Sequence, residues 1–259
     1  MENKANHWRE LIRPRMIDVE RATLSDRYGR FSCEPLERGY GITLGNALRR
    51  ILLASIRGAA VTSIRLHGKE GPALHEFTTI PGIIEDVTEI VLNIKSLRLK
   101  LHGSAEATLR LKSDQPGALT AAAIQPPANV SILNPELHIC TLADQGSIDM
   151  ELTVKEGKGY QPAEWNKTPE DPLDLIAVDS VFTPIERVNY RVTNARVDQH
   201  TDYDKLTIEI WTNGAVRPDD ALAFAAKILK EQISIFINFE ELPEPPATSE
   251  EALEEEPLL

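Results

Sequence analysis

The segment that decides the fold is residues 36–55, LERGYGITLGNALRRILLAS, in which a glycine-rich turn leads into an apolar helix. An apolar stripe at helical spacing predicts a helix within residues 43–55. The stripe consists of Leu44, Leu48, Ile51, Leu52 and Ser55. Gly58 follows at a position where a glycine commonly ends a helix, so we expect the helix to stop there.

Toward the N-terminus, the chain predicts two strands that lead into this helix. Residues 15–25 and 30–36 are rich in β-forming side chains. The Tyr28-Gly29 pair between them supplies a turn. We therefore expect a strand, a turn and a second strand before the glycine-rich segment.

Toward the C-terminus, strand patterns surround a second helix. Residues 59–80 return to strand character, and a narrow apolar stripe predicts a helix over residues 83–97. Acidic residues such as Glu85 in its early turns and Lys95 in its last turn suit the helix dipole. Residues 97–154 alternate apolar and polar side chains between turns, so this part is expected to be β-rich.

The last part of the chain predicts a long loop, three strands and a third helix. The loop covers residues 157–172, and the strands cover 173–182, 186–198 and 206–212, with a turn at Asn213-Gly214. The helix is predicted to begin at Pro218, which suits a first turn, and to reach about Phe239. Apolar residues cover more than half of its circumference. It is therefore either buried on two sides within one chain or in contact with a partner.

Composition and charge narrow the class of protein. Of 259 residues, 42% are hydrophobic and 26% are charged, which is typical of a globular chain. The net charge is −12, but residues 240–259 hold eight Glu and no base, which leaves −4 on residues 1–239. The acidic tail is predicted to be a disordered linker. Residues 1–239 are close to neutral, so their charge does not favour nucleic-acid binding.

The sequence contains no pattern of a secreted, membrane-spanning or metal-binding protein. No apolar stretch is long enough to cross a bilayer, and the first ten residues lack a signal-peptide core. Cys33 and Cys140 are isolated, and the six His have no metal-ligand spacing. We therefore expect a cytoplasmic protein with no membrane contact, no bound metal and no cofactor.

Only the glycine-rich segment suggests an active site. Gly39, Gly41 and Gly45 precede a helix and could let backbone amides approach a phosphate. Their spacing fits neither of the common nucleotide-binding fingerprints, so close packing of the helix is the preferred interpretation. Acidic pairs such as Glu170-Asp171 are typical of a solvated surface. No catalytic residue is nominated.

Residues 36–55 also resemble a signature of the alpha subunit of bacterial-type RNA polymerase. Further segments resemble that family in the family's order: HEFTTIPGIIEDVTEIVLNIKSLR at 75–98, GKGYQPAE at 157–164, DSVFTPIERVNYRVTNARV at 179–197 and QHTDYDKLTIEIWTNGAVRPDDAL at 199–222. Together the matching segments extend over nearly all of residues 11–240. The chain is identified as a member of this family.

This resemblance implies an α+β class and the two-domain alpha N-terminal fold. A discontinuous dimerisation domain would comprise residues 1–57 and 183–239, with a β-rich domain inserted at 58–182 and the acidic linker at 240–259. Family members carry a further small helical domain after the linker that binds promoter DNA. We expect that domain to be absent here, so no direct DNA contact is assigned to residues 1–259.

The resemblance further implies a non-catalytic scaffold subunit of DNA-directed RNA polymerase. Two copies would form a homodimer on which the β and β′ subunits assemble, with omega and sigma contacted through the complex. The complex would lie in the cytoplasm, associated with the nucleoid. Arg50 and Leu53 match positions for β binding, and Lys95 and Val178 match positions for β′ binding. The implied dimer interface contains Leu44, Leu48, Ile51, Leu52, Leu222, Phe224, Leu229, Ile233 and Phe236.

Two other classes of protein remain as alternatives to this scaffold. The first is a stand-alone enzyme that holds a phosphate or nucleotide at residues 39–45, and nucleotide binding by the purified chain would distinguish it. The second is a nucleic-acid-binding module, which would show a salt-dependent affinity for DNA.

Overall fold

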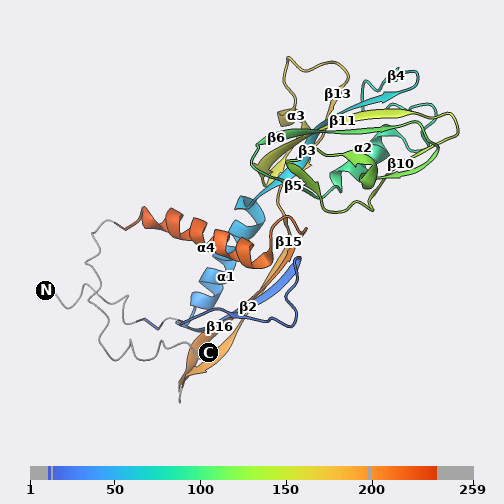
Figure 1. The fold of residues 1–259 in the computed structure, drawn as a ribbon. Coiled ribbons are helices and arrows are strands. Elements are labelled where there is room, and N and C mark those ends of the chain that lie inside the picture. Colours follow the sequence, from blue (N-terminus) through green and yellow to red (C-terminus); the bar gives the residue numbers. More distant parts are fainter. Residues whose placement is uncertain (1–10, 13, 198–199, 238–259) are drawn as a thin grey trace.

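In the computed structural model, the described residues are 11–12, 14–197 and 200–237, and they form two bodies (Figure 1). The bodies meet where helix α1 (Tyr40–Ser55) runs into strand β3 (Arg57–Gly68). Residues 1–10 and the acidic segment 240–259 lie outside the described residues. The described chain contains no helix that is long and apolar enough to cross a membrane.

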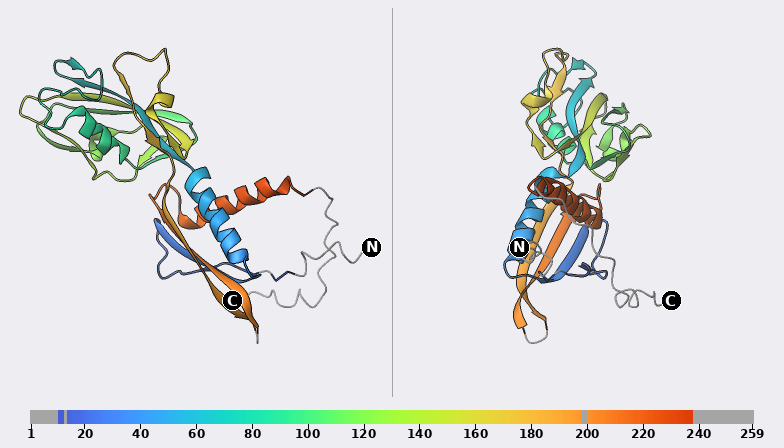
Figure 2. Two further views of the ribbon diagram at one scale, coloured as in Figure 1. Left: turned by 180° about the vertical axis from the view of Figure 1, so that it is seen from behind. Right: turned by 90° about the vertical axis from the view of Figure 1, so that its left-hand side faces the viewer.

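The first body is an antiparallel sheet with helices on one face. Its strand order is β1-β2-β16-β15, with β1 (Asp18–Val19), β2 (Tyr28–Leu36), β15 (Ile185–Val197) and β16 (His200–Thr212). Alternate residues of β16 (Leu206, Ile208 and Ile210) are buried, as expected for a strand with one covered face. Helices α1 and α4 (Pro218–Ser234) cover that face (Figures 1 and 2).

The second body is β-rich and is built around an eight-stranded antiparallel sheet. Six strands follow the order β8-β6-β11-β3-β5-β9, and β4 and β13 also pair with β3. The strands are β4 (Gly71–Pro72), β5 (Leu99–Leu101), β6 (Glu106–Ser113), β8 (Ile124–Gln125), β9 (Val130–Ile132), β11 (Ile148–Lys158) and β13 (Leu175–Ala177). Two small ladders join β7 (Gly117–Thr120) to β10 (His138–Leu142) and β12 (Tyr160–Gln161) to β14 (Ser180–Val181). The helices of this body are α2 (Val87–Lys95), α3 (Ala163–Asn166) and the 3-10 turn η3 (Ala121–Ala123).

Each body has its own hydrophobic core. One cluster of buried apolar side chains draws its members from residues 31–56 and 185–225, and the other from residues 61–178. The β-rich body is therefore inserted in the chain between two segments that share a core. Such a body can bury its apolar surface without help from the other.

A carboxylate from a distant strand caps the start of α1. Gly39 is the N-cap residue, has a φ of 87° and supplies no side-chain acceptor. Asp204 of β16 fills that role, because its Oδ2 accepts hydrogen bonds from the backbone N–H groups of Gly39 (2.8 Å) and Gly41 (3.1 Å). The amides that a phosphate would need are therefore already bonded to a carboxylate of the same chain.

Glycine also lets α1 lie directly on the sheet. A β-carbon at Gly45 would lie 2.6 Å from Cδ2 of Tyr190 and 3.0 Å from Cδ1 of Leu206. Any larger residue would push the helix off strands β15 and β16. This supports the packing interpretation of the glycine-rich segment.

The structure corrects the sequence prediction before β2. Of residues 15–25, only Asp18–Val19 form a strand. The backbone N–H and the hydroxyl of Thr23 both donate to the carbonyl of Glu20 (3.1 and 3.2 Å), so a turn forms there. The Tyr28-Gly29 pair lies inside β2 instead of forming a turn.

The second helix begins four residues later than predicted because of two neighbouring acids. Asp86 is the N-cap of α2, and its side chain accepts from the N–H of Glu89 at 2.8 Å. Glu85 lies outside the helix and binds strand β10, where Thr141 N–H donates to its Oε2 at 2.6 Å and Nε2 of His138 lies 2.8 Å from its Oε1. Partial burial opposes ionisation of Glu85, but the bonds from His138 and Thr141 outweigh it and lower the pKa of this carboxyl. Lys95 does occupy the last turn, as predicted.

Gly58 does not end α1, which begins three residues earlier than predicted. The helix ends because Ile56 becomes extended, with a ψ of 130°, and Gly58 lies within β3. A β-carbon at Gly58 would lie only 2.1 Å from the backbone oxygen of Phe182. Glycine is therefore needed here because the two connections between the bodies pass side by side.

Later elements show both agreements and differences. The turn at Asn213-Gly214 is confirmed, with a φ of 94° at the glycine, and Pro218 begins α4 as predicted. The predicted loop at 157–172 instead contains the end of β11, the short strand β12 and helix α3, and the strand expected at 173–182 is divided into β13 and β14. Helix α4 ends at Ser234, before the predicted end near Phe239.

The cap of α1 leads to a first prediction. Replacing Asp204 with Ala leaves two amides at the helix start without an acceptor, so we expect a loss of about 1–2 kcal/mol in the free energy of unfolding. Asp204→Asn keeps a side-chain oxygen and should lose less. Urea denaturation followed by circular dichroism measures both. Equal stability of Asp204→Ala and the wild type would show that water replaces the cap.

Candidate protein-interaction site

The two residues proposed for binding a large subunit lie in the second half of α1. Arg50 is exposed, and Leu53 is partly buried against the core of the first body. They are three positions apart, so they are neighbours on the helix surface. Within the described part of the chain, no hydrogen bond or ion pair holds the guanidinium of Arg50 or that of Arg49. The structure thus leaves both arginines available to a partner.

The residues expected at a dimer interface fall into three groups in the structure. Leu52 and Leu222 lie inside the core of this chain, so they have little surface left for a partner. Leu44, Leu48, Ile51 and Leu229 are partly buried. Phe224, Ile233 and Phe236 are exposed by 56%, 51% and 83%.

The burial of helix α4 decreases along its length. Its buried residues are Pro218, Ala221, Leu222 and Ala225, all in the first half. From Glu231 onward every described residue is exposed, including Ile235 and Ile237 just after the helix. In Figures 1 and 2 this second half extends past α1 and away from the sheet. The apolar side chains at this end of the helix are therefore left uncovered by the described part of the chain.

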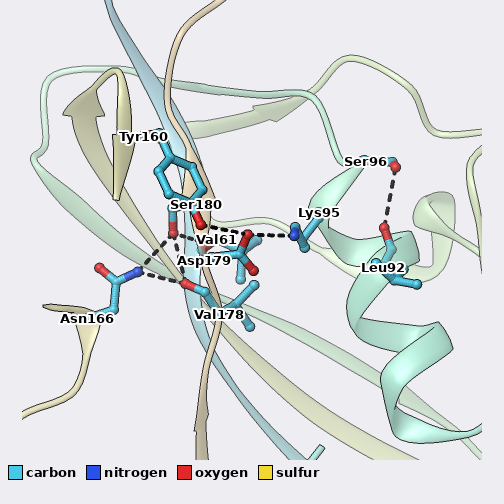
Figure 3. Close-up of polar contacts among 9 residues, drawn as sticks. All are labelled: Val61, Leu92, Lys95, Ser96, Tyr160, Asn166, Val178, Asp179 and Ser180. Carbon is cyan, nitrogen blue, oxygen red and sulfur yellow. Dashed lines mark hydrogen bonds and ion pairs between the residues drawn. The ribbon is translucent and has the colours of Figure 1, made fainter. Parts of the chain in front are cut away.

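The second candidate surface lies on the β-rich body around Lys95 (Figure 3). The Nζ of Lys95, at the end of α2, donates to Oδ2 of Asp179 at 2.6 Å. The hydroxyl of Tyr160 donates to the same oxygen at 3.4 Å. The bond from Lys95 outweighs partial burial and, with the smaller contribution of Tyr160, lowers the pKa of the Asp179 carboxyl.

Val178 lies beside this pair in the sequence, but its side chain is only 1% exposed. Its N–H donates to the carbonyl of Thr62 at 2.9 Å, and its carbonyl accepts from Nδ2 of Asn166 at 2.7 Å. Val178 belongs to the core of the β-rich body, where almost none of its surface is exposed. The structure thus brings Lys95 and Val178 into one neighbourhood but places only Lys95 at the surface.

Sequence reasoning missed the polar residues that join these two positions. Asn166 also donates to the hydroxyl of Ser180 (3.1 Å), and that hydroxyl donates to the carbonyl of Val61 (2.8 Å) (Figure 3). Tyr160, Asp179 and Ser180 all lie in segments that resemble the family's signatures. That resemblance was the signal that could have identified them.

The two cysteines and the possible metal ligands can be compared with those of reactive sites. Burial, with a smaller contribution from Glu85, raises the pKa of Cys140 to about 12, so this thiol is protonated at neutral pH. Burial likewise raises the pKa of Cys33. Across the described ranges, no three His, Cys, Asp or Glu side chains gather as metal ligands would.

The chain is similar to known proteins over most of its length. Residues 61–183 match the family described as the RNA polymerase Rpb3/RpoA insert domain, and this range spans most of the β-rich body. The chain is 52% identical to the DNA-directed RNA polymerase subunit alpha of Pelobacter propionicus over 244 residues, which cover 94% of this chain and 71% of that protein.

Two further relatives give the same result. The subunit alpha of Geobacter metallireducens is 52% identical over 250 residues, covering 96% of this chain and 72% of the relative. That of Desulfosudis oleivorans is 52% identical over 248 residues, covering 95% and 71%. Because the identity extends over nearly the whole chain and both bodies, the protein belongs to the family of alpha subunits of DNA-directed RNA polymerase.

Proposed function

We propose that this subunit is the non-catalytic scaffold on which RNA polymerase assembles. Two copies form a homodimer through α1 and α4, and the dimer recruits the β and β′ subunits, while omega and sigma join through the complex. Residues 1–57 and 183–239 form the dimerisation domain, and residues 58–182 form the inserted domain. The assembled complex works in the cytoplasm, at the nucleoid.

The observation that carries the proposal is a set of exposed apolar side chains along α4 and just after it. Phe224, Ile233, Ile235 and Phe236 are all at least half exposed. Fully burying an exposed side chain of this size is worth about 1.5–3 kcal/mol, and a half-exposed one gains correspondingly less. A twofold axis would bring the same face of a second copy against it, because a symmetric dimer pairs one patch with itself. The partly buried stripe of α1, which packs beside α4, would complete the covered surface.

The twofold symmetry has a consequence for the large subunits. Each dimer presents the Arg50 surface twice and the Lys95 surface twice, yet we propose that each large subunit binds once. One protomer therefore receives β through Arg50 and Leu53, and the other receives β′ through the surface of Lys95. The remaining copy of each surface is free of these two partners.

Dimerisation is tested by placing a charge on the exposed face of α4. Phe224→Asp puts an unpaired carboxylate into the proposed interface, so we expect monomers at micromolar concentration by light scattering. The matched control is Phe77→Asp, because Phe77 is also an exposed phenylalanine (78%) but lies on the β-rich body. A dimer with Phe224→Asp, or monomers with both variants, would contradict the proposed interface.

Recruitment of β is tested with the two neighbouring arginines. Arg50→Ala should leave the dimer intact and reduce capture of purified β at least about tenfold, as expected when a charged contact at an interface is truncated. Arg49→Ala is the control, since Arg49 is also exposed and unpaired in the described chain. If Arg50→Ala gives monomers, Arg50 acts in the fold or the dimer and not in binding β.

The scaffold as a whole is tested by mixing the chain with purified β and β′. Mass measurement of the complex should give about two copies of this chain for one of each large subunit, as a twofold platform requires. Nucleotide binding by the chain alone should be undetectable by calorimetry. A complex with one copy of the chain would contradict the proposal.

A further inference from the structure

Lys95 and Val178 both match family positions for β′ binding, but their side chains cannot contribute to binding in the same way. Lys95 has an accessible ammonium group at the end of α2, whereas the side chain of Val178 is 1% exposed. A buried valine cannot contact another subunit. Any effect of Val178 on β′ binding must therefore be indirect, through a surface residue whose position depends on Val178.

Asp179 is the residue that connects the two positions. It follows Val178 in the chain, and its Oδ2 accepts from Nζ of Lys95 at 2.6 Å. Both side chains keep contact with solvent, with 28% of Lys95 and 33% of Asp179 exposed. An ammonium group has three N–H donors, so the bond to Asp179 leaves two for a partner.

The segment 178–180 is held against β3 by a specific set of bonds. The ladder between β13 and β3 ends at Ala177 opposite Ser63. Beyond it, Val178 N–H bonds to Thr62, and the Ser180 hydroxyl bonds to Val61. Val178 and Ser180 both point inward and are 1% exposed, so the residue between them points outward.

Asn166, at the end of α3, completes this support. Its Nδ2 donates to the carbonyl of Val178 at 2.7 Å and to the hydroxyl of Ser180 at 3.1 Å (Figure 3). One amide thus ties together the two residues that flank Asp179. The position of the Asp179 carboxylate is therefore determined by residues of β3, α3 and the core.

We propose that Asp179 is a positioning residue for β′ binding. It holds the Lys95 ammonium in the orientation that the partner recognises. Val178 and Asn166 act on binding by holding Asp179 in place. This inference rests on the proposed function. The physical gain is preorganisation, because a free lysine side chain loses rotamer freedom on binding and a held one loses less. The contributions of Lys95 and Asp179 to β′ binding are then coupled.

A double-mutant cycle on the dimer of the full chain, preassembled with β, tests whether Lys95 and Asp179 are coupled in binding β′. Binding of purified β′ is titrated for Lys95→Ala, Asp179→Ala and the double variant. We expect Lys95→Ala to weaken binding about tenfold and Asp179→Ala about fourfold, with the double variant no weaker than Lys95→Ala, since coupled residues are non-additive. Independent residues would instead give about fortyfold in the double variant.

Asn166→Ala extends the test to the residues behind Asp179. It should weaken β′ binding about twofold to threefold in the wild-type background and have no effect when Lys95 is already alanine. Binding of β should be unchanged by Asp179→Ala. The melting temperature of the dimer should change little, because an ion pair that keeps contact with solvent contributes little to stability. These two measurements separate a positioning role from general damage to the fold.

Asp149→Ala is the matched control. Asp149 is also ion-paired in the β-rich body, to Arg110 at 3.1 Å, with a similarly exposed side chain (27%). It should leave β′ binding unchanged. The inference is overturned if Asp179→Ala binds like the wild type, if the effects of Lys95→Ala and Asp179→Ala multiply, or if Asp149→Ala weakens binding equally. A wild-type dimer that fails to retain β′ overturns the proposed function, and this inference with it.

Discussion

The close contact between α1 and the strands β15 and β16 is the constraint on which the rest of the structure depends. Gly45 allows the helix to touch Tyr190 and Leu206, and Asp204 accepts from the amides of Gly39 and Gly41. These partners lie more than 140 residues apart in the chain. The N-terminal and C-terminal segments must therefore fold together, and whatever lies between them must leave and return at nearly the same place.

The inserted body meets that requirement at the crossing of Gly58 and Phe182. The two connections approach so closely there that glycine is needed at one of them. The insert has its own core, so its fold does not depend on the helices of the first body. This separation would let one body form the symmetric platform that we propose, while the other offers a surface to a different partner.

The surfaces proposed for assembly differ in their physical nature. The end of α4 is apolar and uncovered, so association there would be driven mainly by burial of side chains such as Phe236. The surface at Lys95 is polar and supported from within by Asn166 and Ser180. Apolar burial suits a permanent dimer, whereas an oriented charge suits recognition of one particular partner.

Local chemistry allowed the sequence alone to determine several elements correctly. The alternation of Leu206, Ile208 and Ile210, the proline that begins α4, and the family membership carried by residues 36–55 all follow from neighbouring residues. The surroundings of Gly58, Glu85 and Val178 were decided by tertiary structure, because each depends on a group far away in the chain: the Phe182 carbonyl, strand β10 and the Thr62 carbonyl. Periodicity reports which face of an element is apolar, but only the packed chain determines which distant atom that face meets.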